Sequence, residues 1–199
     1  MRRILIAVIP VVLLAACSST DSSSVSASSE ATSASSDAPI SSSDFVTSNC
    51  AVVGGAPVSA KSAPAGGITL DGVSVELGKT PKVTVAPGLP AATDVVTKTL
   101  VKGTGATLKA SDTLTFNYCG VGLVSQHQFD SSWANGAPIT YGLSQLIPGW
   151  SVGMPGMKVG EQRLLILPGA QAYGPNPPTA DILPDESLAF VVELVSIQK

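Results

Sequence analysis

The sequence predicts an α+β fold in which an antiparallel β-sheet curves around one short α-helix. From about residue 68 the chain alternates short apolar, β-branched runs with turn residues, which is typical of antiparallel strands. Only one stretch, beginning at Pro148, suits a helix. A single short helix beside many strands buries its apolar side best when the sheet wraps around it.

Turn residues, chiefly glycine, proline and aspartate, separate the predicted strands. The expected strands cover residues 68–70, 73–77, 83–85, 97–102, 113–118, 163–167 and 188–197. In the fifth of them, strict alternation places Leu114, Phe116 and Tyr118 on one face. Cys119 then points to the opposite face.

The predicted helix is bracketed by residues that limit its length. Pro148 is tolerated in a first helical turn, whereas Gly153 and Pro155 end the helix after roughly two turns. The same stretch contains Gly-Trp-Ser-Val-Gly at 149–153, which matches the Gly-x-Ser-x-Gly pattern of serine hydrolases. That pattern needs a long helix after its serine, which Pro155 forbids. The single histidine, His127, also precedes Ser151, contrary to the order of such enzymes, so we reject a nucleophilic serine.

The N-terminus reads as a lipoprotein signal peptide covering residues 1–16. Arg2 and Arg3 precede an apolar run, residues 4–14, that is too short to span a bilayer comfortably. The letters LAAC then resemble a bacterial lipobox, which would make Cys17 the lipidated first residue of an exported protein held at the outer face of the cell membrane. An ordinary signal peptide with an incidental cysteine is the alternative.

The segment after the signal peptide has the composition of a disordered tether. Residues 18–48 contain 15 serines and almost no large apolar side chains, so they cannot bury enough surface to offset ordering entropy. We therefore expect a tether over 17–48, an extension with short strands over 49–94 and the main domain over 95–199. Without residues 1–16 the net charge is −5, from nine basic and fourteen acidic residues, which argues against a nucleic-acid partner.

The remaining cysteines, Cys50 and Cys119, form an even pair in a chain expected to be exported, which suggests a disulfide. Two free thiols are the alternative. If paired, they would fix the N-terminal extension to the outer face of the sheet. The chain has one histidine and no closely spaced cysteine–histidine cluster, so we expect neither a metal nor a cofactor.

Several separate motifs follow one another in the C-terminal half: FDSSW (129–133), LIPGW (146–150), GMKVGEQR (156–163), AYG (172–174) and LPDESLAFVVEL (183–194). A proline-initiated strand lies between the first two. Together, over roughly residues 95–198, they resemble an FKBP-type peptidyl-prolyl cis–trans isomerase. The preceding segment VSVELGKTPKVTV (73–85) is similar to segments in exported actinobacterial members of that family.

The resemblance implies a half-barrel of five or six antiparallel strands around the helix, with a hydrophobic pocket between them. It assigns Trp150 to the pocket floor, Asp130 to an acidic group, and Tyr173 to a hydroxyl donor for a substrate carbonyl. The implied walls and cover are Tyr118, Phe129, Leu146, Ile147 with its backbone N–H, Phe190, Leu183 and Ile139, the last where many members have phenylalanine. A carboxylate among aromatic rings is costly to bury without a role or partners.

The implied activity is the isomerisation of X–Pro bonds in exported polypeptides by non-covalent desolvation and distortion. Macrolides are possible inhibitors, and we expect a monomer. Two alternatives stay open. One is a non-catalytic chaperone or surface interaction module on the same fold, and the other is a structural lipoprotein, which would have no pocket.

Overall fold

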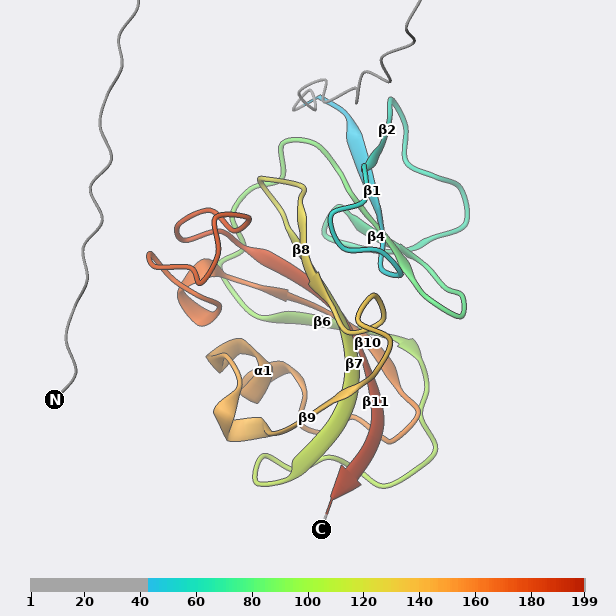
Figure 1. Ribbon diagram of the computed structural model, residues 1–199, viewed down its shortest axis with the longest axis vertical. Helices are drawn as coiled ribbons and strands as arrows, with labels where there is room; N and C mark the ends of the chain where they lie inside the picture. The colour runs from blue at the N-terminus through green and yellow to red at the C-terminus, as the bar shows by residue number, and fades with distance from the viewer. Residues whose placement is uncertain (1–42, 199) are drawn as a thin grey trace, which may run out of the picture. The chain divides into compact units, whose positions relative to one another are not determined.

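The computed structural model describes residues 43–198 (Figure 1). The predicted signal peptide, the lipidation site at Cys17 and residues 17–42 of the predicted tether lie outside the described residues. The tether boundary at residue 48 is wrong, because strand β1, Phe45–Asn49, begins inside it. Val46 supplies the reason, since its side chain is only 1% exposed and belongs to a hydrophobic core.

The N-terminal residues form a five-stranded antiparallel sheet. Its strands are β1, β2 (Val58–Ala60), β3 (Ile68–Leu70), β4 (Val73–Glu76) and β5 (Lys82–Val85), in the order β2-β1-β5-β4-β3. The β3–β4 hairpin turns through Asp71 and Gly72, whose φ angles are 45° and 79°. Two positive φ angles in a two-residue loop match the twist of the flanking strands, which explains the Asp-Gly pair.

The C-terminal residues form a six-stranded antiparallel sheet. Its strands are β6 (Val96–Val101), β7 (Thr113–Gly122), β8 (Gln128–Ser131), β9 (Ile139–Gly142), β10 (Gln162–Leu167) and β11 (Leu188–Gln198). The order is β6-β10-β11-β7-β8, and β9 also pairs with β7. Antiparallel strands with one short helix are confirmed, but the prediction of a single sheet is wrong, because residues 45–85 build a second one. The half-barrel curvature stays a prediction.

The helix α1, Pro148–Gly153, has six residues, close to the roughly two turns expected, and it begins and ends where the sequence predicts. Two 3-10 turns lie nearby, η1 (Leu143–Gln145) and η2 (Gly169–Gln171). The guanidinium of Arg163, on β10, donates a 2.8 Å hydrogen bond to the carbonyl of Gly153 at the end of α1. No helix between residues 43 and 198 is long and apolar enough to cross a membrane.

The central strands β7, β10 and β11 are buried on both faces, and alternate side chains enter two separate cores. The helix-side cluster comprises Leu108, Leu114, Phe116, Leu143, Trp150, Met154, Met157, Leu165, Leu167, Ala172, Ile182, Leu188, Phe190, Val192 and Leu194. The disulfide-side cluster comprises Cys50, Val73, Val75, Val83, Val85, Leu100, Cys119, Val121, Leu123, Leu164, Ile166, Ala189 and Val191. The helix therefore packs on one face of the C-terminal sheet, and strands β4 and β5 pack on the other (Figure 1).

A disulfide joins Cys50, directly after β1, to Cys119 on β7. Cys119 lies in the disulfide-side cluster, whereas its neighbour Tyr118 packs against the helix-side cluster, as the alternation of strand residues predicts. The link therefore fixes the N-terminal sheet to the face that is remote from α1.

Candidate functional site

A cavity of about 240 Å³ lies between α1 and the C-terminal sheet. It is lined by Phe116, Tyr118, Ile139, Gln145, Leu146, Ile147, Trp150, Tyr173 and Phe190. Seven of these nine residues are among the site residues that the sequence predicted. Strands β7 and β11 supply one wall, and η1, β9 and the start of α1 supply another.

Trp150 is held rigidly within this cavity. Its side chain is only 4% exposed, and the rings of Phe116 and Phe190 meet it edge-on with centroids 5.1 and 5.2 Å away. The ring of Tyr118 approaches in the same way at 5.9 Å. Edge-to-face contacts at these separations are favourable and restrict ring rotation. The indole therefore offers a fixed flat surface to whatever enters.

Local backbone geometry places Leu146 and Ile147 at the cavity. Leu146 caps the 3-10 turn η1, and its N–H donates to the carbonyl of Leu143. Ile147 is extended, with φ −58° and ψ 148°, because proline follows it. The first N–H groups of a helix have no intrahelical partner, so the N–H of Ile147 is a suitable donor to a bound carbonyl. Ile139, at the start of β9, completes this wall.

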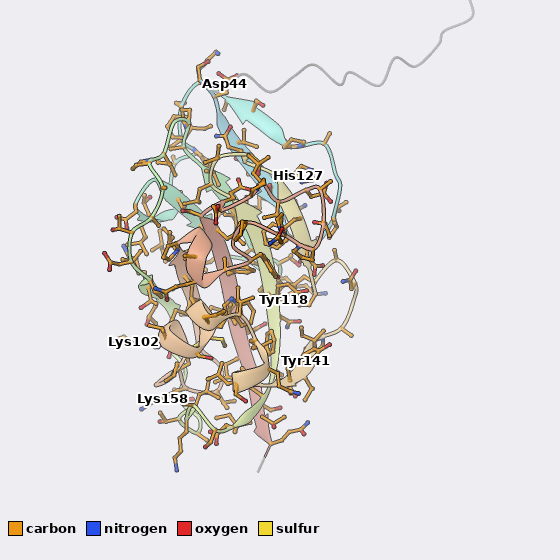
Figure 2. The ribbon with its side chains drawn as sticks, turned by 90° about the vertical axis from the view of Figure 1, so that its left-hand side faces the viewer. Asp44, Lys102, Tyr118, His127, Tyr141 and Lys158 are labelled. Atoms are coloured by element: carbon orange, nitrogen blue, oxygen red, sulfur yellow. A yellow bond between two sulfur atoms is a disulfide. The ribbon has the colours of Figure 1, made fainter. Side chains whose placement is uncertain are left out.

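Asp130 lies behind the cavity wall rather than in it. Its carboxylate accepts a hydrogen bond from the hydroxyl of Tyr118, and the N–H of Ser131 donates to the other oxygen at 2.8 Å. Burial of Tyr118, and then its hydrogen bond to this carboxylate, raises the pKa of the phenol far above its usual range. The phenol is therefore neutral at physiological pH and acts as a donor. Tyr118 lies between His127 and Tyr141 in Figure 2.

Tyr173 and Phe129 form the opposite side of the site. Tyr173 lines the cavity, and its ring is perpendicular to that of Phe129 at 6.3 Å. Phe129 does not line the cavity but supports it, because its ring also packs edge-on against Phe190 at 5.6 Å. Burial, followed by the nearby charge of Asp130, raises the pKa of Tyr173. A second neutral hydroxyl is thus present at the cavity.

Leu183 is the one predicted residue that the structure places away from the cavity wall and from its supporting rings. Its side chain is 43% exposed, and its N–H donates to the buried carboxylate of Glu186 at 2.9 Å. A loop tip with an exposed leucine does not close over the cavity in this structure.

Sequence reasoning did not assign Phe116 and Gln145 to the site. Phe116 had a usable signal, because it shares the alternating face of Tyr118. Gln145 had none. It lies in the 3-10 turn η1, which the sequence did not predict, and its side-chain oxygen accepts a 3.0 Å hydrogen bond from the N–H of Gly142.

The remaining chemical candidates do not form a second reactive centre. The hydroxyl of Ser151 donates to the carbonyl of Leu143 at 3.3 Å, so it is directed to the backbone rather than to a base. The Nδ1 of His127 lies 3.9 Å from Asp181. Across residues 43–198 there is no group of three or more histidine, cysteine or acidic residues that could hold a metal ion.

The family model for FKBP-type peptidyl-prolyl cis-trans isomerases matches residues 105–195. An FK506-binding protein of Streptomyces anulatus is 38% identical over 120 residues, which cover 59% of this chain and 96% of that protein. A probable FK506-binding protein of Corynebacterium glutamicum is 37% identical over 107 residues, covering 54% and 90%. The crystal structure of FkpA from Escherichia coli is 34% identical over 53% of this chain and 49% of that one, with a TM-score of 0.49.

This chain therefore belongs to the family of FKBP-type peptidyl-prolyl cis-trans isomerases, and it is an enzyme of that class. The match to the family model begins after β6, so all five strands of the N-terminal sheet precede it. That sheet is an addition whose relation to the site has to be argued from this chain's own contacts.

Proposed function

We propose that this chain accelerates cis–trans isomerisation of X–Pro bonds in polypeptides by seating the proline ring on Trp150. One observation carries the proposal: a rigid indole lies in an apolar cavity that is bordered by two neutral phenols, those of Tyr118 and Tyr173. The cavity of about 240 Å³ is smaller than the ~300–1,000 Å³ typical of sites for drug-sized ligands, which suits one amino-acid side chain.

The chemistry needs no nucleophile. Resonance gives the planar amide a rotation barrier of about 18–20 kcal/mol, and X–Pro exchange takes tens to hundreds of seconds without a catalyst. The planar amide is the more charge-separated form, so an apolar cavity disfavours it relative to the twisted transition state. Binding that favours the twisted form over the planar form accelerates the rotation.

Two kinds of donor would hold the peptide around the bound ring. The hydroxyl of Tyr173 and the N–H of Ile147 would each take one substrate carbonyl and bend the chain into a turn. Asp130 holds the phenol of Tyr118 through a hydrogen bond and adds a negative charge behind the wall. Its proposed role is to fix that wall and to shape the electrostatic field at the rotating bond.

We further propose that the chain acts on exported proteins, as a monomer anchored at the outer face of the cell membrane by lipid on Cys17. The Cys50–Cys119 disulfide supports the exported location independently of the signal peptide, since disulfides persist mainly in oxidising compartments. Unfolded exported chains would supply the X–Pro bonds. A macrolide would compete for the cavity.

A protease-coupled assay with X–Pro peptides tests the activity. The full chain with its disulfide intact should accelerate the slow cis-to-trans phase, and a macrolide should abolish that acceleration. A slow phase equal to the uncatalysed rate at micromolar protein, together with tight binding of unfolded polypeptide, would overturn the proposal in favour of a non-catalytic binding module.

A further inference from the structure

Strand β8 carries Phe129 and Asp130, yet it has little support from its own sheet. It has four residues, lies at the edge of the C-terminal sheet and pairs with β7. The pairing is irregular, because Gly120 faces Asp130 and Val121 faces Gln128, which leaves Phe129 without a partner across the ladder. A short bulged edge strand is a weak place from which to hold a site residue.

Cys50, in the N-terminal segment, is bonded to both strands of the β7–β8 pair, and we call its contacts with Cys119 and Ser131 the clasp. The sulfur of Cys50 is bonded to that of Cys119 on β7. The backbone carbonyl of Cys50 accepts a 2.6 Å hydrogen bond from the hydroxyl of Ser131 on β8. Cys119 and Ser131 face each other in the ladder. Cys50 is itself tied to its own sheet, since its N–H donates to the carbonyl of Pro81.

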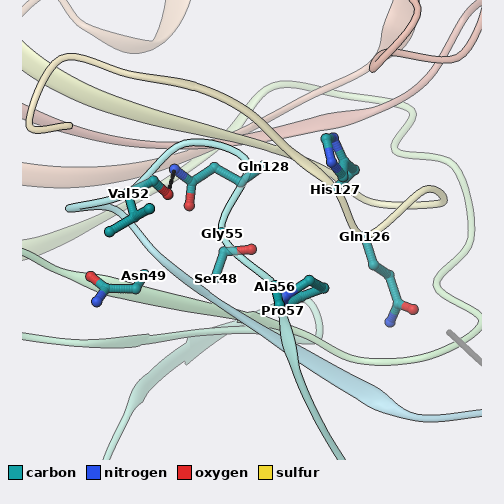
Figure 3. A pocket seen from close by; sticks show the side chains of 9 residues that line it. All are labelled: Ser48, Asn49, Val52, Gly55, Ala56, Pro57, Gln126, His127 and Gln128. Atoms are coloured by element: carbon teal, nitrogen blue, oxygen red, sulfur yellow. Dashed lines mark hydrogen bonds between the residues drawn. The ribbon is translucent and has the colours of Figure 1, made fainter. Parts of the chain in front are cut away.

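Two glutamines extend this clasp along the turn that leads into β8. The amide of Gln128 donates to the carbonyl of Val52 at 3.0 Å, as the dashed line in Figure 3 shows. The amide of Gln126 donates to the carbonyls of Asp44 and Val85 at 3.0 and 3.2 Å. Both side chains are nearly fully buried. The acceptors are all backbone carbonyls of the N-terminal segment, so this sheet holds the strand by its buried side.

We propose that the N-terminal sheet is a positioning element of the isomerase site, and that Ser131 and Gln128 are the positioning residues through which it acts. They bind the N-terminal carbonyls, while Phe129 and Asp130, which lie between them in the bulged strand β8, contact the aromatic rings of the cavity and Tyr118. The inference rests on the proposed isomerase function for its activity readout.

The physical reason is the direction in which each side chain of β8 is fixed. Asp130 is half-buried, and one of its oxygens accepts a hydrogen bond from Tyr118. This single hydrogen bond cannot by itself hold an edge strand in position. The clasp restricts β8 from the opposite face without occupying the cavity. Loss of the clasp should therefore move Asp130 and Phe129 relative to Trp150 and leave the indole itself in place.

The test uses three variants: Ser131→Ala, Gln128→Ala and the double variant that carries both substitutions. Thr47→Val serves as the control. Thr47 is a matched control, because its hydroxyl bonds Thr84 inside the N-terminal sheet at 2.8 Å and reaches no residue of β8. Each variant is measured for kcat/KM on an X–Pro peptide and for the ultraviolet titration of Tyr118, identified by its loss in Tyr118→Phe.

We expect the double variant to lose about tenfold in kcat/KM, since small misplacements at a site cost one to two orders of magnitude. Tyr118 of the double variant should titrate at lower pH than in the parent chain, because the hydrogen bond between its hydroxyl and the carboxylate of Asp130 is weakened. Thr47→Val should change neither. The proposal is overturned if the folded double variant keeps both parental values, or if only one of the two readouts changes.

Two further outcomes have their own readouts, namely a double variant that does not fold and a parent chain that is inactive. If the double variant does not fold, Gln128→Ala alone carries the test, since the disulfide and the Ser131 bond remain. If the parent chain shows no isomerisation, the proposed function fails, while the Tyr118 titration still reports whether the clasp positions Asp130.

Discussion

The two faces of the C-terminal sheet are built from the same strands but to different ends. On the helix side, three buried aromatic rings surround a cavity of about 240 Å³ with phenol hydroxyls at its edge. On the disulfide side, valines and other aliphatic side chains fill the core, and a covalent bond joins the two sheets. A cavity of about 210 Å³ exists there too, but no aromatic residue lines it. Lining chemistry, rather than cavity size, therefore distinguishes the site.

Two neighbouring residues of β11 test whether the two faces of the sheet differ in function. Phe190 and Val191 point to opposite faces, and each is at most 1% exposed. Phe190→Ala should cost about 3–5 kcal/mol of unfolding free energy and most of the activity, because it removes a wall of the cavity. Val191→Ala should cost about 2 kcal/mol and leave kcat/KM within about twofold.

Urea unfolding and the peptide assay at 10 °C check this pair. The distinction between the faces fails if Val191→Ala, while still folded, loses as much activity as Phe190→Ala.

The disulfide gives the next largest expected effect. It closes a sequence separation of 69 residues, so in the chain-entropy account its removal costs about 2–4 kcal/mol. The double substitution Cys50→Ser with Cys119→Ser, measured by urea unfolding, should show this loss and a partial fall in activity through β8. An unchanged unfolding midpoint would show that the N-terminal sheet does not depend on the link.

Two hydroxyls on β7 should differ in their contribution to stability by a smaller amount. Tyr118→Phe removes the donor to Asp130 and should cost about 1–2 kcal/mol, because it leaves a half-buried carboxylate with fewer hydrogen bonds. Thr115→Val, on the same strand as Tyr118, removes an exposed bond to Thr140 on β9 and should cost less than about 0.5 kcal/mol. Unfolding midpoints of the two variants provide the measurement, and equal losses would contradict the importance of the Asp130 contact.

The pH dependence of stability should report the helix-side face alone. The folded pKa values of Tyr118 and Tyr173 are raised above the ordinary value of 10.0 by burial and by Asp130. Above pH 10 the folded chain therefore holds more protons than the unfolded chain. The stabilisation is complete below pH 10 and declines as the pH rises beyond it. The urea midpoints at pH 9 and pH 11 should differ less in Tyr118→Phe than in the parent chain. An equal difference would show that Tyr118 does not contribute to the pH dependence of stability.

Much of the C-terminal sheet was predictable because its strands alternate cleanly. The face shared by Leu114, Phe116 and Tyr118, the opposite orientation of Cys119 and the short helix after Pro148 all follow from local periodicity and turn residues. These signals lie within a few residues of one another, so tertiary contacts did not have to be known.

The features that the sequence did not predict depend on contacts between residues that are distant in the chain. Strand β1 lies in a serine-rich segment and is stabilised by pairing with β5, nearly forty residues away. Strand β8 is a bulged edge strand held by carbonyls of the N-terminal segment. The Tyr118–Asp130 pair could be anticipated only as a need, since a buried carboxylate requires partners, while its partner was set by the register of β7 and β8.

The role of Trp150 is tested by the isomerisation rate of Trp150→Ala, measured beside that of Val191→Ala. Trp150→Leu serves as a companion that keeps an apolar side chain, with folding checked for each variant by circular dichroism. We expect Trp150→Ala to lose about a hundredfold or more in kcat/KM, Trp150→Leu to lose nearly as much, and Val191→Ala to stay close to the parent chain. A folded Trp150→Ala that accelerates X–Pro isomerisation as well as the parent would show that the indole is not the floor of a proline site.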